Sequence, residues 1–268
     1  MRVRTSVSVN DADLKIRALL SVSVSVSLSR IADSLLAVLL APACAACHLP
    51  LAQPSHGPVC GTCWNTIGGF TPPLCGRCGD PLPSWRVLTA EARVCPRCKR
   101  RPSALSGSRA IGAYDGSLRA IVHAFKYEGC RSLSRGLGAR LRESAADLLA
   151  AADIVVPVPL HRRRRRRRGF NQARELAGRL GVPMVEALRR VRATPSQTDL
   201  PAAARHDNMR NAFALARGQS VEGLRIVLVD DVSTSGATIE SCARVLRAAG
   251  AADVSAVTAA RVVSRPNE

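Results

Sequence analysis

Residues 225–246 read RIVLVDDVSTSGATIESCARVL, and this stretch decides the fold. The apolar run from Ile226 to Val229 predicts a short strand that is buried on both faces. Two carboxylates, Asp230 and Asp231, stand where that strand is expected to end. A loop of small residues follows, and apolar positions then recur at helical spacing up to Gly250. The stretch therefore predicts a strand, an acidic pair, a loop and a helix in succession.

The loop after the acidic pair has the chemistry of a phosphate and sugar site. Its backbone N–H groups and the following helix N-terminus could surround a phosphate, and Gly236 would allow a close approach. The carboxylates would repel a phosphate, so they are expected to hold vicinal ribose hydroxyls or a hard cation such as Mg²⁺. The predicted ligand-binding residues are Asp230, Asp231, Val232, Ser233, Thr234, Ser235, Gly236, Ala237 and Thr238.

Two simpler interpretations of the loop fit less well. An ordinary turn with an Asp cap needs far fewer hydroxyl residues than this loop carries. A GxGxxG dinucleotide loop and a Walker A lysine are both missing from the stretch. Residues 227–238, VLVDDVSTSGAT, resemble the 5-phosphoribosyl-1-pyrophosphate (PRPP) motif of type I phosphoribosyltransferases.

Eight of the ten cysteines form four Cys-x-x-Cys pairs between residues 44 and 98. Two such pairs supply the four thiolates of a tetrahedral structural zinc site, and four pairs without a thioredoxin-like context argue against redox motifs. Taken in order, the pairs predict one site from Cys44, Cys47, Cys60 and Cys63 and a second from Cys75, Cys78, Cys95 and Cys98. An interleaved pairing remains open. His48 and His56 could each replace a cysteine, although eight thiolates need no substitute.

The chain divides into three expected parts: a low-complexity, disordered extension over residues 1–30, a double zinc ribbon with a leading helix over 31–102, and a domain over 103–268. The leading helix is expected over Ile31–Leu40. In the last part, strands at 109–114, 153–159 and 184–187 alternate with helices at 118–125, 133–151 and 169–180. Such alternation predicts an α/β fold with a mostly parallel sheet flanked by helices, whose ligands gather at the carboxyl ends of the strands.

The composition is strongly basic, with a formal net charge of +19 and a pI near 11.0. This charge favours a polyanionic partner such as nucleic acid. Lysine occurs at only three positions, however, and a skew toward arginine is also what a biased nucleotide composition would produce. No apolar run is long enough to cross a membrane, and a clean secretory signal is missing, so a cytoplasmic protein is expected.

Seven consecutive arginines, Arg162 to Arg168, follow the strand that ends near Pro159. We interpret the run as a loop at the ligand-binding edge. Most of its residues are expected to form a solvated or nucleic-acid-binding surface, with Arg168 as part of the site. The neighbouring Asn171 and Gln172 could either contact the ligand or cap the next helix.

Three segments together with the zinc-ribbon pattern are similar to the ComF family of competence-associated, phosphoribosyltransferase-like proteins. They are FKYEG at 125–129, PVPLHRRRRRRRGFNQARELA at 157–177 and RATPSQTDLPAAARHDNMRNAF at 192–213. The resemblance covers residues 31–264 and implies a type I phosphoribosyltransferase fold. It implies handling of single-stranded DNA during natural transformation, with other DNA-uptake proteins as possible partners. The longer arginine run and the Ser/Val-rich extension depart from the family pattern.

The resemblance implies roles for single residues. Asp230 and Asp231 would be catalytic and hold the ribose and Mg²⁺, and residues 234–238 would cradle the 5′-phosphate of PRPP. Arg168 would lie near the other end of the ligand. Gln197, Arg205 and Asn208 fit either a structural or a site role. For the helix-end pair Lys126 and Tyr127, the residues suggest no role.

Two hypotheses follow from these features. The first is an enzyme, a phosphoribosyltransferase that needs Mg²⁺ and releases pyrophosphate to an acceptor that the sequence leaves open. No histidine stands out as a catalytic base. The alternative is a non-catalytic module that binds single-stranded nucleic acid and retains a PRPP pocket, because neither the arginine run nor the zinc ribbons are needed for sugar transfer.

Overall fold

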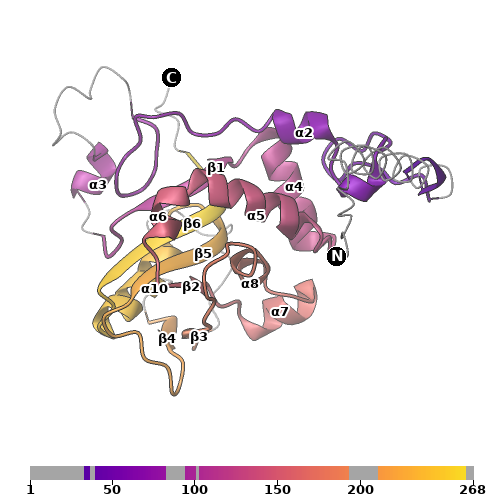
Figure 1. The fold of residues 1–268 in the computed structure, drawn as a ribbon. Coiled ribbons are helices and arrows are strands. Elements are labelled where there is room, and N and C mark those ends of the chain that lie inside the picture. The colour runs from indigo at the N-terminus through magenta and orange to yellow at the C-terminus, as the bar shows by residue number, and fades with distance from the viewer. Residues whose placement is uncertain (1–32, 37–39, 83–93, 101–102, 193–210, 264–268) are drawn as a thin grey trace, which may run out of the picture.

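A computed structural model describes residues 33–36, 40–82, 94–100, 103–192 and 211–263 (Figure 1). The N-terminal extension, half of the expected leading helix, and Gln197, Arg205 and Asn208 lie outside these residues. The zinc-ribbon part contains η1 (Pro54–His56), α2 (Gly61–Asn65) and α3 (Pro96–Arg100). The helices after it are α4 (Gly116–Tyr127), α5 (Leu133–Ser144), α6 (Ala146–Ala150), α7 (Arg162–Arg168), α8 (Gln172–Ala177) and α10 (Ala237–Ala248).

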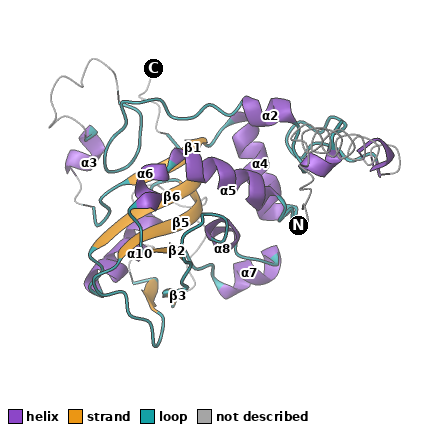
Figure 2. Cartoon of the chain, viewed as in Figure 1, coloured by secondary structure: helices purple, strands orange, loops and turns teal. Residues whose placement is uncertain are grey.

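Four strands form one parallel sheet in the order β1-β6-β5-β2, which confirms the predicted α/β class (Figure 2). Their bounds are Ser108–Ala113 for β1, Asp253–Arg261 for β6, Arg225–Ser233 for β5 and Ile154–Pro157 for β2. A separate antiparallel pair joins β3 (Leu188–Arg190) to β4 (Phe213–Leu215). The central strands are apolar and buried on both faces, as covering helices require.

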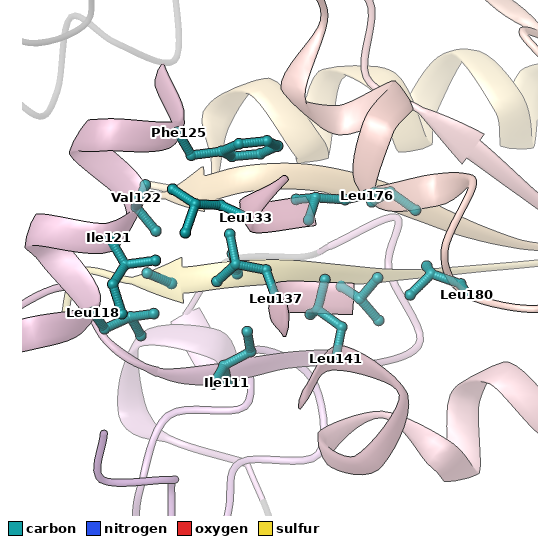
Figure 3. Packing of buried hydrophobic residues seen from close by; sticks show 14 of the residues in the cluster. Ile111, Leu118, Ile121, Val122, Phe125, Leu133, Leu137, Leu141, Leu176 and Leu180 are labelled. Carbon is teal, nitrogen blue, oxygen red and sulfur yellow. The ribbon is translucent and has the colours of Figure 1, made fainter. Parts of the chain in front are cut away.

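Helices cover the two faces of the sheet with different side chains. On one face Phe125 of α4, Leu137 of α5 and Leu176 of α8 pack with Val227 and Val229 of β5 (Figure 3 shows the helix side chains). On the other face α10 packs against the alternate residues of β5, Ile226 and Leu228. The helices on each face therefore pack against every second residue of β5. The side chains that follow Val229 in the strand must point to the two faces of the sheet in the same alternation.

The zinc-ribbon part packs against edge strand β1 and helix α5. Trp64 lies over Gly136 of α5, where an added Cβ would come within 2.5 Å of the indole ring. The carbonyl oxygen of Gly68 similarly lies 2.4 Å from the position of a Cβ at Gly112 in β1. Asp80 forms an ion pair with Arg261, the last residue of β6, whose side chain is buried. Glycines at both contact points thus allow close approach, of the Trp64 ring to α5 and of the backbone at Gly68 to β1.

Four local predictions were wrong. The expected helix over 133–151 is interrupted at Ala145 (φ −125°), where the sequence has neither a proline nor a glycine. The short strand begins at Leu188, whereas Met184 makes only an isolated bridge with Val155. Strand β5 continues through the acidic pair to Ser233 because β6 pairs with it along its whole length.

The fourth error concerns the arginine run, which forms helix α7 and is not a loop. Arginine is a good helix former, and the local backbone preference outweighs the repulsion of exposed charges. Helical spacing separates the run into two faces. Arg165, Arg166 and Arg167 are exposed, while Arg164 and Arg168 are partly covered.

Candidate functional site

The two aspartates lie at the carboxyl end of β5, side by side in the chain but on opposite faces of the sheet. Asp231 continues the face of Val227 and Val229 and is buried, with 9% of its surface exposed. Asp230 is half-buried and continues the face toward α10. Its carboxylate accepts a hydrogen bond of 2.8 Å from the backbone N–H of Asp231. One strand end therefore presents carboxylates in two directions.

Burial raises the pKa of Asp230 to about 7, and the neighbouring charge of Asp231 adds to this rise. The backbone N–H of Asp231 and the cations Lys126 and Arg168 act in the opposite sense, because they favour the charged form. Removal from water dominates this balance. A bound cation or a hydroxyl donor would therefore stabilise the charged form of the Asp230 carboxyl group.

The loop after β5 turns into α10 at Gly236, which has a φ of +78° and is the N-cap of the helix. This left-handed conformation suits glycine and would strain a residue with a side chain. The hydroxyl of Ser235 accepts a bond of 3.4 Å from the N–H of Ala237. Ser233 is buried, whereas Thr234, Ser235 and Thr238 are half-buried. The loop thus presents hydroxyls and N–H groups at the start of a twelve-residue helix, where an anion is favoured.

Asp231 lies between two cations. The Nζ of Lys126, at the end of α4, is 3.0 Å from Oδ1, and the Nη1 of Arg168, at the end of α7, is 3.6 Å from Oδ2. All three side chains are largely buried, with 11–13% of their surfaces exposed. The structure therefore brings Arg168 to Asp231 of the acidic pair, and its expected place near the other end of the ligand stays a prediction. It adds Lys126, which sequence reasoning singled out only through the FKYEG segment.

Arg168 has three further contacts around its guanidinium group. Its Nη1 donates to Oε1 of Gln172 at 3.2 Å, and its Nη2 donates to the hydroxyl of Tyr127 at 3.4 Å. The guanidinium carbon also lies 5.1 Å from the centre of the Tyr127 ring. Both members of the helix-end pair, Lys126 and Tyr127, are therefore part of this cluster. Tyr127 remains 52% exposed.

The neighbouring Asn171 and Gln172 have different roles, which sequence reasoning left open. Asn171 is the N-cap of α8, because its Oδ1 accepts from the N–H of Ala173 at 3.1 Å. Its amide nitrogen donates to the carbonyl oxygen of Val158 at 3.2 Å, which ties the helix to the end of β2. Gln172, in contrast, points to Arg168. Both polar atoms of the Asn171 side chain are thus bonded to the backbone.

The eight cysteines form two clusters with the sequential pairing, Cys44, Cys47, Cys60 and Cys63 in one and Cys75, Cys78, Cys95 and Cys98 in the other. Within each cluster the sulfur atoms lie within 4.8 Å of one another. The Sγ atoms of Cys47 and Cys60 are 3.9 Å apart, and those of Cys78 and Cys95 are 3.7 Å apart. A tetrahedron with Zn–S bonds of about 2.3 Å has edges of about 3.8 Å.

Backbone donors support this assignment. The N–H groups of Ala46 and Cys60 both point to the sulfur of Cys44 at 3.4 Å, and the N–H of Cys95 points to that of Cys75 at 3.3 Å. Such donors stabilise thiolates, the form that binds zinc. The donor set fits two closed, structural zinc sites, and neither His48 nor His56 belongs to these clusters.

In the part of the chain that the structure describes, no helix is long and apolar enough to cross a membrane.

Comparison with known proteins agrees with both parts of the chain. A model of the phosphoribosyl transferase domain matches residues 165–268, and one of the double zinc ribbon domain matches residues 35–102. Among solved structures, a glutamine PRPP amidotransferase from B. subtilis is 27% identical and matches 51% of this chain and 30% of its own. Its TM-score of 0.35 is too low to support an argument about function.

Three relatives have closely similar extents. "DNA utilization protein YhgH" of Salmonella typhimurium is 33% identical over 79% of this chain and 93% of its own length. "Competence protein F" of Haemophilus influenzae is 31% identical over 73% and 87%, and "Competence protein ComFC" of Bacillus subtilis is 28% identical over 76% and 84%. Identity at this level over most of both chains shows common descent. The chain belongs to the ComF family.

Proposed function

We propose that this chain binds PRPP and acts as a phosphoribosyltransferase that uses Mg²⁺, releases diphosphate and serves DNA utilisation or natural transformation. The observation that carries the proposal is the meeting of three features at one sheet edge. These are an anion-binding loop at the start of α10, the carboxylates of Asp230 and Asp231, and the cations Lys126 and Arg168. A phosphorylated sugar with a second anionic group has matching chemistry at each point.

In the proposed complex the 5′-phosphate accepts hydrogen bonds from the loop 234–238. The ribose hydroxyls donate to the carboxylates, and the diphosphate lies toward Lys126 and Arg168. During transfer the bond from C1 to the diphosphate oxygen breaks, the electron pair leaves with diphosphate, and a lone pair of the acceptor forms the new bond to C1. The site would contribute by positioning the ligand and by stabilising the charge on the leaving group.

The carboxylates fit an Mg²⁺ ion in part. Asp231 already has a cation at each oxygen, so Asp230, whose charged form is poorly solvated, is the better protein ligand for a second cation. Mg²⁺ usually keeps several waters and binds through one or two carboxylates together with substrate phosphates. The ion would then neutralise charge on the diphosphate, while the protein residues hold the sugar and the 5′-phosphate.

Calorimetric titration of PRPP with Mg²⁺ into the zinc-loaded protein tests the proposal. We expect the wild type to bind and the double variant Asp230→Ala, Asp231→Ala to lose binding. A matched control is Asp147→Ala together with Asp153→Ala, because both carboxylates form ion pairs with arginines, Arg109 and Arg225, that are not partners of the acidic pair. A folded wild type that gives no binding heat would contradict the proposal.

A second candidate function rests on the exposed face of α7. Arg165, Arg166 and Arg167 are exposed on the helix that also carries Arg168 to the acidic pair. Three adjacent cations suit the phosphate backbone of a single-stranded nucleic acid. Under this alternative the chain binds nucleic acid without catalysis and retains the PRPP pocket as a sensor or relic.

Salt dependence distinguishes this alternative from general basicity. We compare binding of single-stranded DNA by a triple Arg→Gln variant at 165, 166 and 167 with a control triple variant at Arg119, Arg135 and Arg217, three other exposed arginines. The plot of log K against log salt has a negative slope. Loss of three phosphate contacts should make that slope less steep by roughly 2. Equal slopes in the two triple variants would contradict a specific role for α7.

A further inference from the structure

The second cysteine cluster has almost no apolar core of its own. Among the described residues, its core consists of three buried cysteines and three partly buried neighbours, Cys78, Leu82 and Val94. A module with so few apolar side chains depends on its metal for a fixed shape. The first cluster differs, because Cys44 and Cys63 belong to the large core that also contains the helices over the sheet. Loss of the second metal would therefore loosen the chain around that cluster.

Asp80 is positioned by the same turn that presents the zinc ligands Cys75 and Cys78. The N–H of Gly79 donates to the carbonyl oxygen of Cys75 at 2.8 Å, and the N–H of Cys75 donates to that of Asp80 at 2.8 Å. Gly79 has a φ of +74° and lies so close to β1 that a Cβ there would overlap the carbonyl oxygen of Ser108. The place of Asp80 therefore depends on the shape of this turn.

Arg261 is the partner of Asp80 and lies at the end of the sheet where the phosphate loop begins. Its side chain is buried and forms an ion pair with Asp80. Its backbone lies between two strands, in register with Ser233 of β5 and Ala113 of β1. The N–H of the next residue, Val262, donates to the carbonyl oxygen of Ser233 at 2.9 Å. A buried guanidinium that loses its carboxylate is strongly unfavourable, so Arg261 would then move toward water and draw the end of β6 from β5.

We propose that zinc binding at the second cluster is coupled to the order of the loop that follows Ser233. With the cluster closed, Asp80 holds Arg261 and the end of β6 pairs with Ser233. With the cluster open, Asp80 leaves, and residues 260–262 separate from β5. This segment is the two-state element that both sites bias. The inference rests on the proposed function only in taking the loop as the PRPP site.

Hydrogen exchange of the full chain, measured without any ligand, tests the coupling. Cys78→Ser removes the second zinc, and exchange in peptides covering 230–238 and 258–263 should rise about 5- to 150-fold, the usual range for coupling between sites. Asp80→Asn should give a similar rise while both zinc ions are retained. Cys47→Ser, which removes the first zinc, should leave these peptides as in the wild type. The rise should exceed any rise in β2, because local opening and not global unfolding limits exchange at the loop.

A double variant connects the effect to the ion pair. If Asp80 transmits it, adding Cys78→Ser to Asp80→Asn should raise the exchange of 230–238 no further. Wild-type exchange of these peptides in Cys78→Ser, or an equal rise in Cys47→Ser, would overturn the inference.

Titration with PRPP and Mg²⁺ forms a separate arm of the test. Cys78→Ser should bind PRPP about fivefold more weakly or worse, and Cys47→Ser like the wild type. Equal affinities in the two variants would contradict control of the ligand site by the second cluster. A wild type that binds no PRPP would contradict the proposed function alone, because the exchange measurement uses no ligand.

Discussion

At the scale of single residues, Lys126 contacts Asp231 more closely than Arg168 does. Lys126→Met keeps most of the side-chain volume but leaves Asp231 with only the longer contact to Arg168. We expect a lower melting temperature, because one partner of a largely buried ion pair is removed. PRPP affinity should also fall, since the diphosphate loses a cation. Differential scanning calorimetry and titration measure the two effects.

The conservative variant Lys126→Arg is the control for charge. It should retain most of the stability and more of the affinity than Lys126→Met. If Lys126→Met melts like the wild type and binds PRPP equally, Lys126 has no role in holding Asp231.

The charged carboxylate of Asp230 is expected to lower the stability of the folded chain and to be needed for PRPP binding. Its pKa in the folded chain is raised to about 7 from an ordinary value of 3.8, so the folded state loses stability as pH rises through this interval. Asp230→Asn removes that loss and should melt at a higher temperature than the wild type at pH 8. The advantage should shrink as pH falls toward 5, where the wild-type group is protonated, and the variant should fail to bind PRPP. Melting curves across this pH range measure the difference.

Asp153→Asn provides the opposite case. Its exposed carboxylate is hydrogen-bonded to Arg225, which lowers the pKa of Asp153. This variant should gain no stability at pH 8. A wild type whose stability relative to Asp230→Asn does not change with pH would contradict the account of Asp230.

At the scale of elements, the ion pair between Asp80 and Arg261 joins the second zinc cluster to strand β6. Asp80 follows Cys78 by two residues, and Arg261 pairs in register with Ser233, where the phosphate loop begins. Asp80→Asn leaves the buried guanidinium without its carboxylate, a change expected to cost about 3–5 kcal/mol. Hydrogen exchange should show the loss of protection first in β1 and β6.

The exposed pair of Arg109 and Asp147 is a matched control. Asp147→Asn removes a partner whose side chain is 56% exposed, so its cost should be about 1 kcal/mol or less. Equal destabilisation by the two variants would show that the Asp80 contact does not fix the zinc-ribbon part to the sheet.

At the scale of the whole molecule, the two cysteine clusters predict two zinc ions per chain. Cys47→Ser should lower the zinc content to one, and Cys47→Ser with Cys63→Ser should still retain one, because both residues belong to the same cluster. Cys47→Ser with Cys78→Ser should retain none. Metal analysis of the purified variants gives the counts. Loss of both ions in the Cys47, Cys63 variant would indicate interleaved pairing.

The sequence predicted well wherever a pattern repeats or has few physical solutions. The short, β-branched apolar run before Asp230 predicts a buried strand. The four Cys-x-x-Cys pairs predict metal binding. The sequence predicted poorly where neighbours in space decide. The residues near Asp231 do not indicate that pairing with β6 extends β5 beyond this position. They also do not indicate that Lys126, about a hundred positions earlier in the chain, lies beside Asp231. A block of like charges is typical of a solvated loop, so the sequence gives no sign of the helix at the arginine run.

We propose that PRPP binds with its 5′-phosphate in the loop before α10 and its diphosphate beside Arg168. A crystal structure of the zinc-loaded protein with PRPP and Mg²⁺ tests this claim most directly. We predict phosphate oxygens within hydrogen-bond distance of the backbone N–H groups of residues 234–238, and diphosphate oxygens within reach of Lys126 and Arg168. PRPP bound elsewhere, for example along the exposed arginines of α7 with the loop empty, would contradict the account.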